Sequence, residues 1–71
     1  MASLTKRSIN LAGHATSLAL EREFWAVLET MAKGDQLALA QLLVRIDQAR
    51  GDQPLASACR VAALTWAMGR V

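Results

Sequence analysis

Two reactive side chains, Cys59 and His14, are the only cysteine and the only histidine of the chain. A metal site needs several such ligands close together, so neither residue predicts a bound metal, and no cofactor motif accompanies them. Glu21 and Glu23 are the nearest pair of carboxylates, but side chains two residues apart on a helix do not face each other. We expect His14 to serve in a turn and Cys59 to be a small buried hydrophobic residue. With no catalytic set in view, the sequence predicts a protein that is not an enzyme.

Lys6 and Arg7 form a short basic pair near the start of a chain whose formal net charge is +2. Such a pair suits two roles, a clamp on nucleic-acid phosphates or a solubilising start to a strand, and it does not choose between them. Trp25 and Trp66 carry rings of the type that stacks on bases. Both fall on apolar helical stripes, however, which favours anchors in the core or at a dimer interface.

The chain has 71 residues, of which 54% are hydrophobic, so it is one small domain with more apolar surface than so short a chain readily buries. Small domains gain stability from disulfides, metals or oligomerisation, and a single cysteine leaves oligomerisation. We therefore expect an obligate homodimer, with higher assembly left open. No apolar run approaches the roughly 20 residues of a membrane span, and the start lacks the order of a signal peptide, so we expect a cytoplasmic protein with no membrane partner.

Two short segments alternate polar and apolar residues with the period of a strand. Residues 7–11 alternate, Ala12-Gly13-His14 can turn the chain, and residues 16–20 alternate again, with Leu18 and Leu20 on one face. Residues 1–5 are expected to form a disordered start, and residues 6–71 a single domain.

Three helices are expected after the strands, each from apolar residues that recur at helical spacing. They begin near Glu21, Leu39 and Pro54, and Gly34, Gly51 and Gly69 suit their ends. Asp47 of the second helix and Arg60 of the third have the chemistry of an acid and an electrophile, but an ion pair between the two helices is the preferred interpretation. The residues predicted for the core or the dimer interface are Leu18, Leu20, Phe24, Trp25, Leu28, Leu42, Leu43, Ile46 and Trp66.

A strand with only two or three apolar residues cannot stand alone in water, because its backbone groups lack a partner ladder. If the chain holds no second good strand, the same strand of another copy must supply that ladder. Antiparallel pairing about a two-fold axis then gives a two-stranded ribbon with one face on the helices and one face outward. The DNA major groove is wide enough to admit such a ribbon.

Three segments of the sequence match the pattern of a known family. Residues 7–25 resemble the opening R-S-x4-G-H-x-T-S-x2-L-E-x2-F-W of small bacterial ribbon-helix-helix domains. Residues 42–50 resemble the L-x3-I-D-x2-R segment of their second helix, and residues 55–61 resemble the L-x-S-A-x-R-V segment of their third. The resemblance implies a mainly α fold with a short N-terminal β ribbon, a third C-terminal helix, and an intertwined homodimer similar to the Arc and methionine repressors.

The resemblance also implies where DNA would be contacted. Bases would face the outward ribbon residues Ala15, Ser17 and Ala19. Phosphates would face basic residues near the ribbon and backbone amides that open the second helix: Lys6, Arg7, His14, Leu39 and Ala40. Relatives commonly carry an arginine or another polar residue at the position of Ala15 and a serine or longer polar residue at that of Ala19. This sequence departs there, which leaves direct base reading largely to Ser17.

The sequence leaves two functions open. The first is a dimeric DNA-binding transcription regulator that inserts a two-stranded antiparallel ribbon in the major groove of double-stranded DNA. The second is an antitoxin-like protein-interaction module on the same scaffold, with weakened or lost DNA reading. The two alanines favour the second, and the fold alone does not choose, because a fold can persist while its site erodes.

Overall fold

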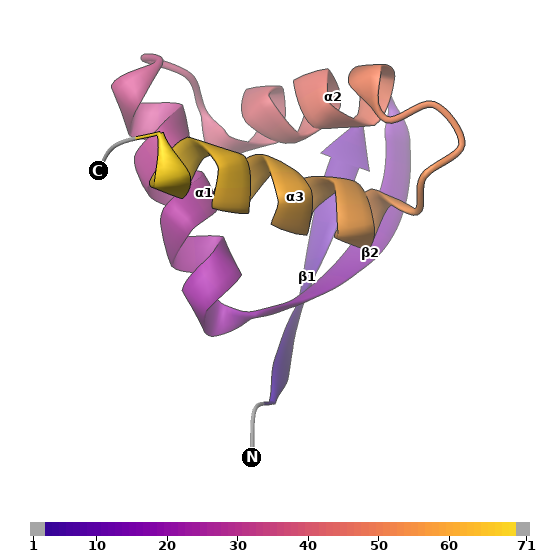
Figure 1. Ribbon diagram of the computed structural model, residues 1–71. Helices are drawn as coiled ribbons and strands as arrows, with labels where there is room; N and C mark the ends of the chain where they lie inside the picture. The colour runs from indigo at the N-terminus through magenta and orange to yellow at the C-terminus, as the bar shows by residue number, and fades with distance from the viewer. Residues whose placement is uncertain (1–2, 70–71) are drawn as a thin grey trace.

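The fold, seen in a computed structural model that describes residues 3–69, is a two-stranded antiparallel ribbon followed by three helices (Figure 1). The strands are β1 (Leu4–Leu11) and β2 (His14–Glu21), and the helices are α1 (Arg22–Gly34), α2 (Leu39–Ala49) and α3 (Leu55–Met68). The predicted fold class is confirmed: a mainly helical chain with a β ribbon at its N-terminal end and a third helix at its C-terminal end. None of the helices described is long and apolar enough to cross a membrane.

The ribbon is a hairpin within one chain, paired without interruption from Leu4 opposite Glu21 to Leu11 opposite His14. Its two-residue turn, Ala12 and Gly13, has φ values of 52° and 92°. Positive φ at both central residues is what a type I′ turn requires, and that turn matches the twist of the flanking strands. The side-chain Oδ1 of Asn10 accepts a hydrogen bond from the backbone N–H of Gly13 at 2.9 Å and steadies the turn.

Two expectations about the ribbon are corrected by this hairpin. The hydrogen-bonded partner of β2, expected from a second copy of the chain, is β1 of the same chain. Residues 4–11 form a full strand, whereas the sequence pattern marked only residues 7–11. Leu4 and Thr5, expected in a disordered start, are paired in β1. Residues 1 and 2 of that expected start lie outside the described residues.

Residues opposite each other on antiparallel strands share one face of the ribbon. The inner face lies against the helices, since Leu18 and Leu20 are buried in the core. The register and the alternation of side chains give the other face, called here the outer face, eight residues: Leu4, Lys6, Ser8 and Asn10 of β1 with Ala15, Ser17, Ala19 and Glu21 of β2.

Helix α1 ends in a Schellman motif, in which two amides beyond the helix bond back to its last turns. The N–H of Leu37 donates to the carbonyl of Ala32 at 2.8 Å, and the N–H of Gln36 donates to that of Lys33 at 3.1 Å. The left-handed residue of the motif is Gln36, with φ of 57°, and not the glycine two positions earlier. Gly34 is the last helical residue, as expected, but it does not supply the turn.

Helices α2 and α3 begin without a side chain that accepts a hydrogen bond from the backbone amides of their first turn. At α2 the Gln41 side chain accepts a hydrogen bond from the N–H of Ala38 at 2.8 Å, which is one half of a capping box. Alanine has no acceptor to complete the other half. At α3 Pro54 stands at the cap position, and Gly69 ends the helix as expected.

The core is buried within a single chain. Six of the nine residues predicted for the core or dimer interface are buried there, and Phe24, Ile46 and Trp66 pack partly buried against it. Val61, Leu64 and Met68, on the far side of α3, are 54%, 56% and 67% exposed. The burial of the main core therefore needs no second copy, and the large apolar side chains left exposed among residues 3–69 are Leu4 of β1 and these three on one side of α3.

Candidate nucleic-acid interface

The outer face of the ribbon presents small and polar side chains along most of its length, with the exposed Leu4 at its open end. Ala15 and Ser17 are exposed and Ala19 is half-buried, so the three predicted base readers do share one outward face. Across the ribbon, Asn10 lies opposite Ala15, Ser8 opposite Ser17 and Lys6 opposite Ala19. All three β1 residues are exposed. Each alanine of β2 therefore has a hydrogen-bonding residue of β1 beside it.

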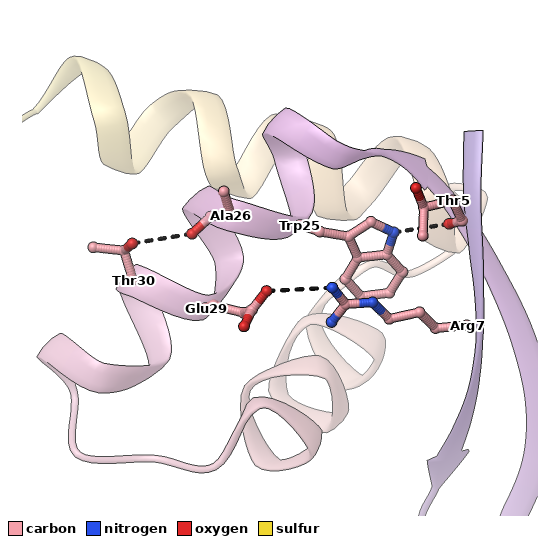
Figure 2. A network of polar contacts seen from close by, with 6 residues as sticks. All are labelled: Thr5, Arg7, Trp25, Ala26, Glu29 and Thr30. Carbon is pink, nitrogen blue, oxygen red and sulfur yellow. Dashed lines mark hydrogen bonds and ion pairs between the residues drawn. The ribbon is translucent and has the colours of Figure 1, made fainter. Parts of the chain in front are cut away.

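Lys6 and Arg7, treated together as a basic pair, point to opposite faces because side chains alternate along a strand. Lys6 lies on the outer face, whereas Arg7 turns inward over α1 (Figure 2). The Arg7 guanidinium sits 4.4 Å from the centre of the Trp25 ring and 3.3 Å from the Glu29 carboxylate. The indole N–H of Trp25 donates to the carbonyl of Thr5 at 2.8 Å. Arg7 is thus engaged in fastening β1 to α1.

The other predicted phosphate contacts lie away from the centre of the outer face. His14 is exposed at the turn end of the ribbon, opposite Leu11, but the alternation that turns Arg7 inward places His14 on the inner face as well. Ala40 is exposed and Leu39 half-buried in the first turn of α2, where backbone amides lack helical acceptors. A phosphate bound there would also meet the positive end of the helix dipole.

The edge of β2 that faces away from β1 borders an open groove. Thr16, Ser17, Leu18 and Ala19 all line it, and consecutive residues can do so only along the edge of a strand, since their side chains alternate between faces. The opposite wall comes from the end of α2 and the start of α3, with Asp47, Arg50, Leu55 and Ala56. The groove has a volume of about 500 Å³. It leaves room beside the strand for another segment.

The predicted ion pair between Asp47 and Arg60 is wrong. Asp47 binds Arg50 of its own helix, with 2.7 Å between the Arg50 Nε and the Asp47 Oδ1. Arg60 instead binds Glu21 at 2.9 Å and joins the end of the ribbon to α3. Residues three apart on a helix are neighbours on its surface, so Arg50 lies within reach of Asp47. A backbone hydrogen bond, and after it the bond from Arg60, holds the pKa of Glu21 below its ordinary value.

Cys59 is fully buried among core residues of α3. Burial raises the pKa of its thiol to about 11, so the thiolate that a nucleophile needs is scarce at neutral pH. Within residues 3–69, no three side chains of histidine, cysteine, aspartate or glutamate gather as a metal site would require.

Sequence reasoning missed the contribution of β1 to the outer face. Ser8 and Asn10 went unnoticed because the partner strand was sought in another copy. One signal was present: a two-residue turn at Ala12 and Gly13 fixes the whole register, and so places Asn10 beside Ala15.

Comparison with known proteins gives two matches. The model of a ribbon-helix-helix domain family matches residues 4–67. Among solved structures, the chain is similar to an uncharacterized protein from Bordetella pertussis Tohama I, with 38% sequence identity and a TM-score of 0.80. That match covers 99% of this chain and 63% of the other, so this chain spans less than two thirds of that protein. No curated protein matches.

Proposed function

The chain belongs to the ribbon-helix-helix domain family, and on that premise we propose that it is a homodimeric DNA-binding transcription regulator. The observation that carries the proposal is the outer face of the ribbon. Six of its eight residues are exposed, it bears one lysine, and its only carboxylate, Glu21, is held by Arg60 at the end of the strand. An exposed strand face of this kind suits the floor of a DNA major groove.

The open edge of β2 supports a dimer formed by strand pairing. In a hairpin with a two-residue turn, the pair that flanks the turn is hydrogen-bonded, and bonded and non-bonded pairs then alternate. By that alternation the amides of Ala15, Ser17 and Ala19 point away from β1, toward the groove. Unpaired amides on an edge are a template for another strand. Two β2 strands paired antiparallel about a two-fold axis would satisfy both edges at once.

In the proposed complex the two β2 strands lie along the major groove. Alanine methyl groups at positions 15 and 19 suit contact with thymine methyls, and the Ser17 hydroxyl is the hydrogen-bonding base contact. The two-fold axis predicts an operator of two inverted half-sites. Lys6 and the amides of Leu39 and Ala40 are the proposed phosphate contacts. A regulator of this kind would act in the cytoplasm, where bacterial DNA lies.

A second candidate is an antitoxin-like module that binds a protein. Two observations favour it: the alanines on the outer face, which carry no hydrogen-bonding group, and the exposed apolar side of α3 formed by Val61, Leu64 and Met68. Under this candidate the chain would keep its fold and its dimer and bind DNA weakly or not at all.

Fluorescence anisotropy with a labelled random-sequence duplex at two salt concentrations tests the proposal, with the mass of the protein measured by light scattering alongside. We expect a dimer whose binding saturates and weakens as salt rises, because bound phosphates release counterions. Selection from a random duplex library should then enrich an inverted repeat. A dimer that binds no duplex at low salt would contradict the proposal and favour the protein-interaction module.

A further inference from the structure

Strand β1 carries a row of outward hydrogen-bond donors, of which only Lys6 has a role in the proposed function. Lys6, Ser8 and Asn10 are exposed and stand side by side along the outer face. Each offers a donor: an ammonium, a hydroxyl and an amide NH2. The arginine between them, Arg7, faces the other way and is occupied by Trp25 and Glu29.

The width of the dimer decides where this row meets DNA. Neighbouring strands lie about 4.8 Å apart, so a sheet in the order β1, β2, β2, β1 places its two outer strands about 14 Å from each other. The major groove is only about 12 Å wide. The central β2 strands therefore fit over the base edges, and each β1 strand lies over a wall of the groove, where the sugar-phosphate backbone runs.

We propose that β1 is a phosphate-binding strand that grips the walls of the groove through Lys6, Ser8 and Asn10, while β2 alone faces the bases. The inference rests on the proposed function and adds to it a division of labour between the two strands. It gives roles to Ser8 and Asn10, and it leaves Arg7 out of the DNA contact.

The chemistry of the three side chains fits phosphate better than bases. Phosphate oxygens only accept hydrogen bonds, and each of these residues has a donor to give. Reading adenine with asparagine uses both the amide NH2 and the carbonyl oxygen. In Asn10 that oxygen already accepts the N–H of Gly13 at 2.9 Å, so the NH2 is the group assigned here to a phosphate. The carboxylate of Glu21, which would repel phosphate, is neutralised by Arg60 at 2.9 Å.

The test compares single variants on two readouts: affinity for a random duplex as a function of salt, and the sequence enriched from a random library. Lys6→Ala should weaken binding roughly tenfold and reduce the slope of log K against log salt by about 1.8, because a dimer loses two phosphate contacts. Ser8→Ala should weaken binding roughly threefold with the slope unchanged, since its donor is neutral. The enriched sequence should stay the same in both variants.

Asn10 needs a variant that spares the turn. Asn10→Asp keeps an oxygen for the N–H of Gly13 but replaces the NH2 donor with negative charge, so it should fold normally and bind DNA at least tenfold more weakly. Lys33→Ala, at an exposed lysine in the last turn of α1, is the matched control and should change neither readout.

The outcomes separate this inference from the function on which it rests. If the wild-type protein binds no duplex, both are overturned. If the wild type binds and the β1 variants bind as tightly as it does, only the phosphate-binding role of β1 is overturned. A change in the enriched sequence with Lys6→Ala or Ser8→Ala would likewise overturn it, because β1 would then be reading bases. Ser17→Ala, in contrast, should alter the enriched sequence.

Discussion

At the scale of single residues, neighbouring basic side chains have separate tasks. Arg7 stacks on Trp25 at 4.4 Å and pairs with Glu29 at 3.3 Å, whereas Lys6, the proposed phosphate contact, lies on the opposite face. A cation over an aromatic ring contributes about 0.5–1 kcal/mol at a partly exposed site, and an exposed ion pair adds about 0–1 kcal/mol. Stability and DNA binding should thus be separable at two adjacent positions.

Arg7→Ala should lower the free energy of unfolding by about 1 kcal/mol, because both contacts with α1 are lost. Urea unfolding followed by tryptophan fluorescence measures the difference. Lys6→Ala is the control, with stability within about 0.5 kcal/mol of wild type. Equal stability of the two variants would contradict the assigned role of Arg7.

The pairing of Glu21 with Arg60 predicts a dependence of stability on acid. The folded state holds the pKa of Glu21 below its ordinary value of 4.5, so the carboxylate stabilises the fold above that pH. This contribution is lost as the pH falls through the lowered pKa of the folded state. Melting temperatures measured from pH 6 to pH 3 should fall less steeply for Glu21→Gln than for wild type. Parallel curves would show that the carboxylate contributes nothing.

At the scale of elements, the three helices were predictable, and the left-handed residue that ends α1 was not. Apolar spacing located α1, α2 and α3 correctly, because burying one stripe is the dominant requirement on a helix. The end of α1 was missed at Gln36, because a left-handed residue need not be glycine where two hydrogen bonds hold the motif. The pairing of β1 with β2 was missed for a different reason. A short alternating pattern indicates which face of a strand is buried, but it does not indicate which strand pairs with it.

Some features of the candidate site were likewise predictable from the sequence, and others were not. The outward set of Ala15, Ser17 and Ala19 followed from alternation, since Leu18 and Leu20 had to be inward. The direction of Arg7 depends on a tryptophan eighteen positions later, and the partner of Arg60 depends on a ribbon end brought to α3 by the fold. Contacts between residues so far apart in the sequence cannot be predicted from the spacing of residue types.

Gln36 offers a test at the scale of the element. A residue other than glycine at a φ of 57° is strained, so Gln36→Gly should stabilise the protein by about 0.5–1 kcal/mol. Ala26→Gly, in the exposed middle of α1, should instead destabilise it by about 1 kcal/mol. Thermal unfolding followed by circular dichroism compares the two. A loss of stability with Gln36→Gly would mean that its side chain contributes more than its backbone strain costs.

At the scale of the whole molecule, a core buried within one chain changes what dimerisation has to achieve. Leu18 is 3% exposed and Leu20 0% exposed without a second copy. The proposed pairing of β2 edges would therefore add an interface to a chain that already buries its central residues. The proposed dimer should be separable from folding.

Ser17→Pro tests that separation. The amide of Ser17 points to the outer edge of β2, so proline there removes a bond of the proposed dimer and none of the hairpin ladder. We expect a monomer by light scattering that retains the helical circular dichroism spectrum. Ser17→Ala, which keeps the amide, should remain a dimer. A dimeric Ser17→Pro variant would place the interface elsewhere.

The buried thiol of Cys59 can be used to measure how often the folded protein opens transiently. Cys59 is the only cysteine, it is fully buried, and a pKa of about 11 keeps it protonated until water reaches it. Alkylation by a small reagent therefore proceeds only through openings of the packed helices, and its rate measures the fraction of time the molecule spends open. Because a ligand that binds the folded state stabilises it, labelling should slow as duplex DNA is added, with no dye or engineered probe on the surface that binds DNA.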